Sequence, residues 1–385
     1  MHPEKNSVSA CYRVACECWW SGRDMYENVY EDKFNDLFNG FVYLPHAAIL
    51  YSPFEALPLW FGETLYRLVI VSMMAWAIWR ITRLASGRPW NEYFFAASAI
   101  TIGVGAGNAI NGQYNLPMAA SIILAACALI EKRWWWGAIW LVISIMLKPL
   151  ALAPALLALA LYPALWWRFP IVALVAFALP FVATAHGPAY AWGEYEMFWT
   201  KVVRAAQPLP RRFAEFSTVF WWFWLDLSDF QRQVCRVIAA IATLALGFAA
   251  LRRRGPVKGG LILWALGASY IVVFNPRTEG LTYVVIAPAI ALFGAIECFA
   301  DRALKWRRCV GLALLAMGVL MIFVHELMPR SGAYAEVAQG SKDLLVRPII
   351  SMILYAWLAW LALFDARGPS LAPARELTPA ARSFP

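Results

Sequence analysis

The chain has 385 residues, 62% hydrophobic and 15% charged, and its formal net charge is +9. A soluble protein of this length could not bury so much apolar surface, so composition excludes that class. Continuous apolar runs of roughly 15–20 residues recur, and they do not alternate as barrel strands do. We therefore expect an all-α polytopic membrane protein, whose basic excess marks its cytoplasmic side rather than nucleic-acid binding.

The apolar runs predict about eleven spans, at roughly 20 residues per crossing. They lie near residues 59–82, 93–107, 114–131, 134–147, 150–166, 168–185, 233–251, 259–274, 281–298, 308–324 and 346–364. We expect one transmembrane domain, residues 1–366, with an outer N-terminal segment (1–58) and a long outer loop (186–232). A Pro/Ala-rich disordered cytoplasmic tail, 367–385, follows.

Basic loops set the orientation in what we expect to be the cell (inner) membrane. One set of loops is rich in Lys and Arg with few acids, including Arg80, Lys132, Arg133, Arg254 and Lys258. The positive-inside rule makes this set cytoplasmic, and an odd span number leaves the N-terminus outside. Polar turns and all four histidines then face outward. A transporter divides such features between its faces, so the one-sided pattern favours an external active site.

The N-terminal stretch "SACYRVACECWWSG" predicts a short amphipathic helix closed by Gly22. No hydrophobic signal segment precedes it. Two explanations stay open: an N-terminus that is outside without a preceding span, or a gene start that lacks a first helix.

Lys148 is the first candidate for substrate binding. The span 134–147 rises only about 21 Å, short of a roughly 30 Å hydrocarbon core. Pro149 disfavours helix at the residue before it, so Lys148 should sit at a recessed break. An ionisable group there is expected to bind a phosphate or diphosphate; the alternative is a lysine that snorkels to the interface.

Two polar turns offer further candidates for substrate binding. "NAINGQYN" contributes the amides of Gln113 and Asn115, which suit a hydroxyl-rich ligand, unless the turn only caps helix ends. "NPRTEG" contributes Arg277 and Glu279. Arg277 could hold a phosphate through two hydrogen bonds, or pair with Glu279 and only shape the turn.

The outer segments supply the remaining candidates. Arg211 and Arg212 of the long loop could gather an anionic lipid head group. Glu4 and Asp24 are candidate bases, and His325 is a candidate acid/base or a structural histidine at a helix end. The sequence has no HExxH motif or clear metal spacing, and we expect no metal or cofactor.

Four stretches, in this order, resemble glycosyltransferase family 87, polytopic enzymes of the C superfamily. They are "ACYRVACECWWSGRDMYE", "FVYLPHAAILYSPFEALP", "NGQYNLPMAASIILAACALIEKRWWWGAIWLVISIMLKPLALAP" and "FNPRTEGLTYVVIAP". The resemblance covers roughly residues 6 to 300, and the GQ-x-N hairpin before a Lys-Pro span is its most specific part. It implies many membrane helices around an outward cavity, a polyprenyl-phosphate-linked sugar donor, often mannose, and a lipid or glycan acceptor.

The resemblance also implies an aspartate just after a first span, acting as base on the acceptor hydroxyl. Here that stretch reads "EKNSVSACY", with Asn6 and Ser7 and no aspartate, so Glu4 and Asp24 are the nearest candidates. The expected function is inverting hexosyl transfer on the outer face. Two other classes remain open: a transporter or flippase of lipid-linked sugars, and a noncatalytic envelope-assembly subunit.

Overall fold

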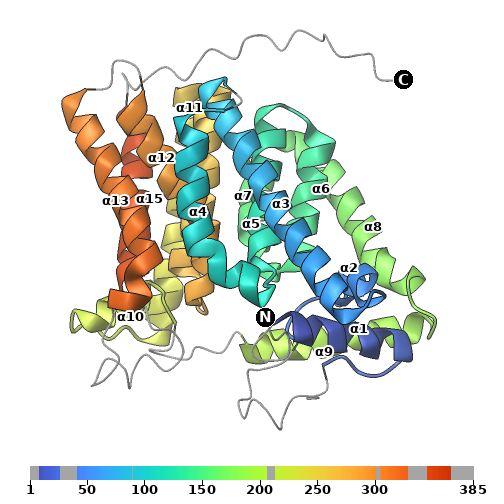
Figure 1. Cartoon of the computed structure of the whole chain (residues 1–385). Helices are drawn as coiled ribbons and strands as arrows, with labels where there is room; N and C mark the ends of the chain where they lie inside the picture. The colour runs from blue at the N-terminus through green and yellow to red at the C-terminus, as the bar shows by residue number, and fades with distance from the viewer. Residues whose placement is uncertain are drawn as a thin grey trace, which may run out of the picture.

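The computed structural model of the chain describes residues 8–26, 41–88, 90–205, 213–300, 304–327 and 345–365. Regular structure in these residues is helical, and the long helices form one bundle (Figure 1). The bundle helices are α3 (Leu59–Ser86), α4 (Glu92–Asn111), α5 (Asn115–Ile130), α6 (Trp134–Leu147), α7 (Leu152–Leu161), α8 (Arg168–Val182), α11 (Asp229–Phe274), α12 (Ala287–Phe299), α13 (Lys305–Leu327) and α15 (Val346–Leu363).

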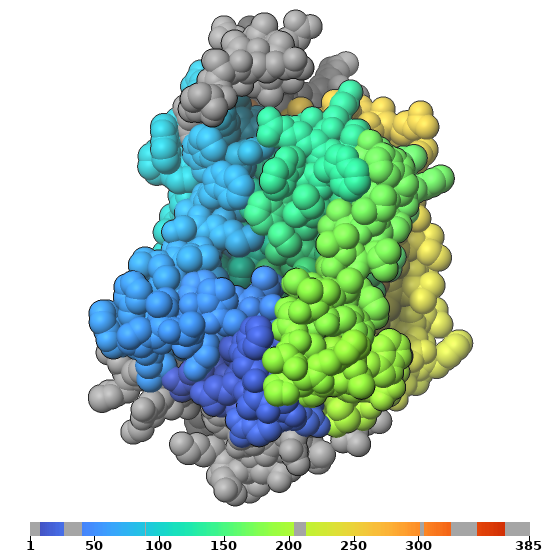
Figure 2. Space-filling model, turned by 90° about the vertical axis from the view of Figure 1, so that its right-hand side faces the viewer, coloured from blue at the N-terminus to red at the C-terminus, as the bar shows by residue number. Residues whose placement is uncertain are grey.

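Four shorter or amphipathic helices gather at one end of the bundle, which we name the capped end (Figure 1). They are α1 (Ser9–Ser21), α2 (Pro45–Glu55), α9 (Pro188–Ala205) and α10 (Phe216–Trp222). α1 ends at Gly22 with φ 70°, as the sequence predicts. In the space-filling view α1 and α9 lie side by side along the lower edge (Figure 2).

Within the described residues, seven helices are long and apolar enough to cross a membrane, and α5, α6 and α7 are shorter apolar helices. Helical segments occupy all the predicted spans, which confirms the all-α polytopic class. The number of crossings, predicted as about eleven at roughly 20 residues each, stays a prediction.

α11 is 46 residues long, but Gly255 breaks it with φ 75° and ψ 177°. Its two arms run antiparallel, because Arg236 Nε donates to the Phe274 carbonyl at 3.0 Å and Gly247 lies against Leu263. The chain therefore reverses in the basic loop predicted between the spans 233–251 and 259–274. Glycine suits this reversal, since this φ/ψ region is essentially closed to other residues.

α5 and α12 form the centre of the bundle. Every residue of α5 except Ala126 is buried, and 89% of the 18-residue apolar stretch within Gly280–Phe299 is buried. The corresponding 18-residue stretch within Pro163–Val182, which includes α8, is only 17% buried. A helix that is apolar all round yet exposed on most sides is suited to contact with lipid.

The end opposite the capped end holds a buried ion network that joins α12 and α13 to the residues around α15. Arg307 donates to both Glu297 oxygens, at 2.6 and 2.8 Å, and to Asp365 at 2.7 Å. Lys258 Nζ also donates to Asp365, at 2.7 Å. Each charge is thus paired with an opposite one, the condition for burying ions at tolerable cost.

Candidate active site

Lys148 lies at a break between two short helices, as the sequence predicts. α6 ends at Leu147, and Lys148 is extended, with φ −154° and ψ 121°, before Pro149 begins a turn of 3₁₀-helix. Its Nζ donates to Asn115 Oδ1 at 2.8 Å. Among the described side chains it forms no ion pair within 4.0 Å. Its charge therefore stays available to an anionic ligand.

Gln113 and Asn115 lie in the tight connection between α4 and α5, where Gly112 ends α4 with φ 64°. Asn115 Nδ2 donates to Gln113 Oε1 at 2.8 Å, and both residues are buried. Tyr114, the N-cap of α5, makes no side-chain capping bond. The two amides therefore do not serve as caps; they extend a polar chain from Lys148. We call Gln113, Asn115 and Lys148 the Lys148 cluster.

The turn Asn275–Gly280 brings Glu279 to the same place. Its carboxylate lies within electrostatic range of the Lys148 ammonium and of Tyr43. Arg277 takes a different direction, with its guanidinium 5.8 Å from the centre of the Phe213 ring. The structure thus groups Glu279 with the Lys148 cluster and places Arg277 beside the segment that precedes α10.

Tyrosines form an aromatic wall where α1 meets the α4–α5 connection. Tyr12 stacks on Tyr114 with ring centres 4.0 Å apart, and its hydroxyl donates to Tyr43 at 3.3 Å. Tyr51 and Tyr66 pack edge-on against Tyr12. Aromatic faces beside amides and a cation suit a ligand with both apolar and polar surfaces, such as a sugar.

Asp24 lies beside a second carboxylate that the sequence analysis did not select. Asp24 Oδ1 accepts from the Tyr26 N–H at 2.7 Å, and the Tyr26 hydroxyl donates to the Tyr43 carbonyl at 2.6 Å. Glu194 of α9 is 4% exposed and accepts from the Met25 N–H at 3.3 Å. Burial, and then the charge of Asp24, raise the pKa of Glu194 to about 7.

A pKa near 7 is the range in which a carboxylate serves best as a general acid or base. The sequence held a signal for Glu194: with the buried Ala191 and Phe198 it continues the apolar stripe of an amphipathic helix. An acid in such a stripe is a stronger candidate than its neighbours on the solvated face.

Three other predicted site residues are not placed. Glu4, Arg211 and Arg212 lie outside the described residues. For His325 only the backbone is described, within the last two turns of α13. In the described parts of the chain no group of three or more His, Cys, Asp or Glu side chains could hold a metal ion.

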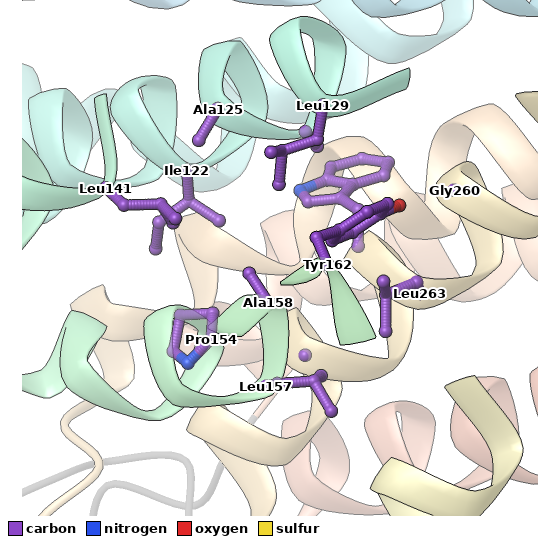
Figure 3. A pocket seen from close by; sticks show the side chains of 13 residues that line it. Ile122, Ala125, Leu129, Leu141, Pro154, Leu157, Ala158, Tyr162, Gly260 and Leu263 are labelled. Carbon is purple, nitrogen blue, oxygen red and sulfur yellow. The ribbon is translucent and has the colours of Figure 1, made fainter. Parts of the chain in front are cut away.

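An apolar cavity of 40 Å³ lies among α5, α6, α7 and α11 (Figure 3). Leu129, Leu141, Ala158 and Leu263 point into it, and Tyr162 is its one lining side chain with a hydroxyl. A gap of this size and chemistry has room for a methyl group but not for a sugar ring. The cavity is therefore a packing gap. The polar side chains that could act on a substrate lie at the capped end instead.

A polar cavity of 60 Å³ opens at the capped end beside α1 and α2, lined in part by Arg13, Tyr51, Glu55 and Glu63. Glu63 is held by Tyr51, by Ser9 and by an ion pair with Arg67. This agrees with the structural role that its i, i+4 spacing from Arg67 indicates. Glu63 is thus occupied within the protein.

Comparison with known proteins places the chain in a family. No curated protein matches it. The family model for glycosyltransferase family 87 matches residues 41–276, a range that includes Gln113, Asn115, Lys148 and Glu194. This match covers more than half of the chain and confirms the resemblance found in the sequence. The chain belongs to glycosyltransferase family 87, whose members are membrane glycosyltransferases.

Proposed function

We propose that this protein transfers a hexose, with mannose as the first candidate, from a polyprenyl-phosphate donor to a lipid or glycan acceptor. The reaction takes place at the capped end, on the outer face of the inner membrane. The observation that carries the proposal is the setting of Lys148, a recessed cation in a membrane bundle. Its Nζ donates to a neutral amide at 2.8 Å, and the Glu279 carboxylate lies within electrostatic range.

The orientation follows from the distribution of charge. Arg80, Arg254, Lys258 and Arg307 lie at the end of the bundle away from α1 and α9, and basic residues mark the cytoplasmic side. The capped end then faces outward. No nucleotide sugars are available there, which favours a sugar carried on a lipid phosphate.

The reaction is a single displacement at the anomeric carbon. A carboxylate takes the proton of the acceptor hydroxyl, the acceptor oxygen bonds to the carbon, and the bond to the donor phosphate breaks. The bonding electrons leave with the phosphate, whose growing charge Lys148 stabilises. One displacement inverts the configuration of the sugar carbon.

Asp24 is our proposed base among the described carboxylates. It is partly exposed, so an acceptor can reach it, while Glu194 behind it is buried. The hydrogen bond from Tyr26 to Tyr43 connects the segment that carries Asp24 to the aromatic wall, because Tyr43 packs against Tyr114. Glu279 lies nearer the phosphate site and is proposed to bind sugar hydroxyls together with Gln113 and Asn115. Glu4 and His325 stay in the proposal as alternative bases, and Arg211, Arg212 and Arg277 as contacts to the donor head group.

The test uses the purified full chain in proteoliposomes with polyprenyl-phosphate mannose and extracted membrane glycolipid acceptors. We expect transfer of labelled mannose, and loss of at least about 100-fold in Asp24→Asn, the scale for removing a general base. Glu17→Gln is the matched control, because Glu17 is an exposed acid on α1. Full activity of Asp24→Asn, Glu4→Gln and His325→Ala would refute all three assignments of the base.

Movement of intact donor between the leaflets, without sugar transfer, would contradict the transferase proposal and support a flippase. The same vesicles report this outcome, because donor accessibility to an added chemical reagent can be followed beside product formation.

A further inference from the structure

A crevice of 220 Å³ is lined by residues of α3, α5 and α6 and of the α5–α6 connection, at the end of the bundle opposite the capped end. It is separate from the Lys148 cluster, because it is lined by the last turns of α5 while Asn115 begins that helix. Its lining residues are Trp76, Arg80, Leu124, Ala128, Arg133, Trp136 and Trp140.

Two arginines are held together at this crevice. A single oxygen, Glu131 Oε2, accepts from Arg80 Nη2 at 2.6 Å and lies 3.3 Å from Arg133 Nε. The Arg133 side chain is 58% exposed, and Glu131 only 12%. Two cations share one carboxylate, so the group keeps one net positive charge. Each guanidinium carries five N–H donors, which leaves several for an incoming anion.

The connection between α5 and α6 adds a third cation. Lys132 N donates to Leu129 O at 3.1 Å and Arg133 N donates to Ala128 O at 2.7 Å, which closes a tight turn after α5. Lys132 has φ 58°, a conformation that usually selects glycine. A lysine there costs on the order of 1 kcal/mol of strain, and it adds a basic residue directly before Arg133 in the chain.

The other wall of the crevice is apolar and aromatic. Trp76 and Trp140 meet edge-on with ring centres 5.8 Å apart, and Trp76 and Trp136 are 41% and 55% exposed. Exposed tryptophans beside basic residues are typical of the depth at which lipid head groups meet acyl chains. The crevice is therefore basic toward the cytoplasm and apolar toward the bilayer.

We propose that this crevice binds one anionic glycerophospholipid of the cytoplasmic leaflet. Arg80 and Arg133 bind the phosphate, and the acyl chains lie against Trp76, Leu124 and Ala128. Basic pockets between membrane helices on the cytoplasmic side suit such head groups. The site is independent of sugar transfer, which takes place at the other end.

The experiment titrates detergent-purified full-length protein with phosphatidylglycerol and counts bound lipids by native mass spectrometry. We expect one tight phosphatidylglycerol, and binding about 30-fold weaker in Arg80→Gln/Arg133→Gln, at roughly a factor of five per basic residue. Arg83→Gln/Arg252→Gln is the matched control: it removes two exposed arginines outside the crevice and should change binding less than about 2-fold.

Removal of both arginines could disturb folding by leaving Glu131 without its partners, so a second variant leaves all charges in place. Ala128→Leu fills the crevice and should abolish the tight lipid while the thermal midpoint in detergent is kept. Equal binding of phosphatidylcholine, or wild-type binding in both crevice variants, would overturn the proposal. Displacement of the lipid by millimolar inorganic phosphate would also overturn it, because the site would then be one for free anions.

Discussion

The proposal for the active site depends most on Lys148, and the variant Lys148→Met tests it. Methionine has nearly the length of lysine, so it fills the same space and removes only the ammonium. Loss of one donor aimed at developing negative charge typically lowers kcat by 10²–10³, or about 2.7–4 kcal/mol. We expect a loss in this range, because Asn115 is the one described hydrogen-bond partner of Lys148 Nζ and cannot replace its charge.

Stability should change much less than activity. The variant loses a charged hydrogen bond, worth about 1.5–3 kcal/mol, and leaves Asn115 Oδ1 without that donor. The variant also gains stability, because folding no longer withdraws an ammonium from water, and that penalty is of similar size. The two effects nearly cancel, so the thermal midpoint should shift by only a few degrees.

The assay compares kcat/KM for transfer from polyprenyl-phosphate mannose in wild type, Lys148→Met and Lys132→Met. Lys132 is an exposed lysine at the opposite end and serves as the control. Lys148→Arg keeps the charge and should recover part of the activity. If Lys148→Met keeps kcat/KM within about 3-fold of wild type while folded, the phosphate role of Lys148 is wrong, since a charge contact at the transition state costs far more.

Three further predictions follow from other parts of the structure. Gln113→Ala/Asn115→Ala should lower transfer at least about 10-fold at unchanged membrane insertion, since buried donors to sugar hydroxyls contribute about 1 kcal/mol or more each; wild-type transfer would contradict this. Folding raises the pKa of the Glu194 carboxyl from 4.5 to about 7. Between these two pH values the folded state binds more protons than the unfolded state, so Glu194 lowers the stability of the fold as the pH rises. Glu194→Gln should therefore gain up to about 3 kcal/mol over wild type at pH 8 and little at pH 4, as thermal unfolding at both pH values would show. Gly255→Ala should cost about 1–3 kcal/mol in the same measurement, from backbone strain alone, because no atom apart from the adjoining backbone lies within 4 Å of the added methyl group.

The local part of this architecture could be predicted from the sequence. Apolar runs locate the spans, the basic stretch before Lys258 locates the turn of α11, and Pro149 locates the break at Lys148, because each depends on neighbours in the chain. The number of crossings could not be predicted as firmly. α5, α6 and α7 are shorter than a membrane helix, and length alone does not separate a short span from a buried helix.

The composition of the site depends on contacts between distant residues and was only partly predictable. The sequence predicted Lys148 and Asn115 as separate candidates, and the hydrogen bond between them shows that they lie together. That Glu279 rather than Arg277 lies near Lys148 depends on how the turn after α11 packs, and spacing carries no such information. Glu194 was overlooked because its pKa depends on burial beneath α1 and on the charge of Asp24, neither of which is local to α9.

The four-membered ion network at the end opposite the capped end has a consequence for biogenesis. Arg307 and Glu297 are synthesised before α15, whereas Asp365, which completes the network, follows that helix. A nascent bundle without α15 leaves Arg307 with one carboxylate and Lys258 without its partner. We therefore expect a chain truncated before α15 to form a less stable bundle, because Lys258 and Arg307 then lack the Asp365 carboxylate.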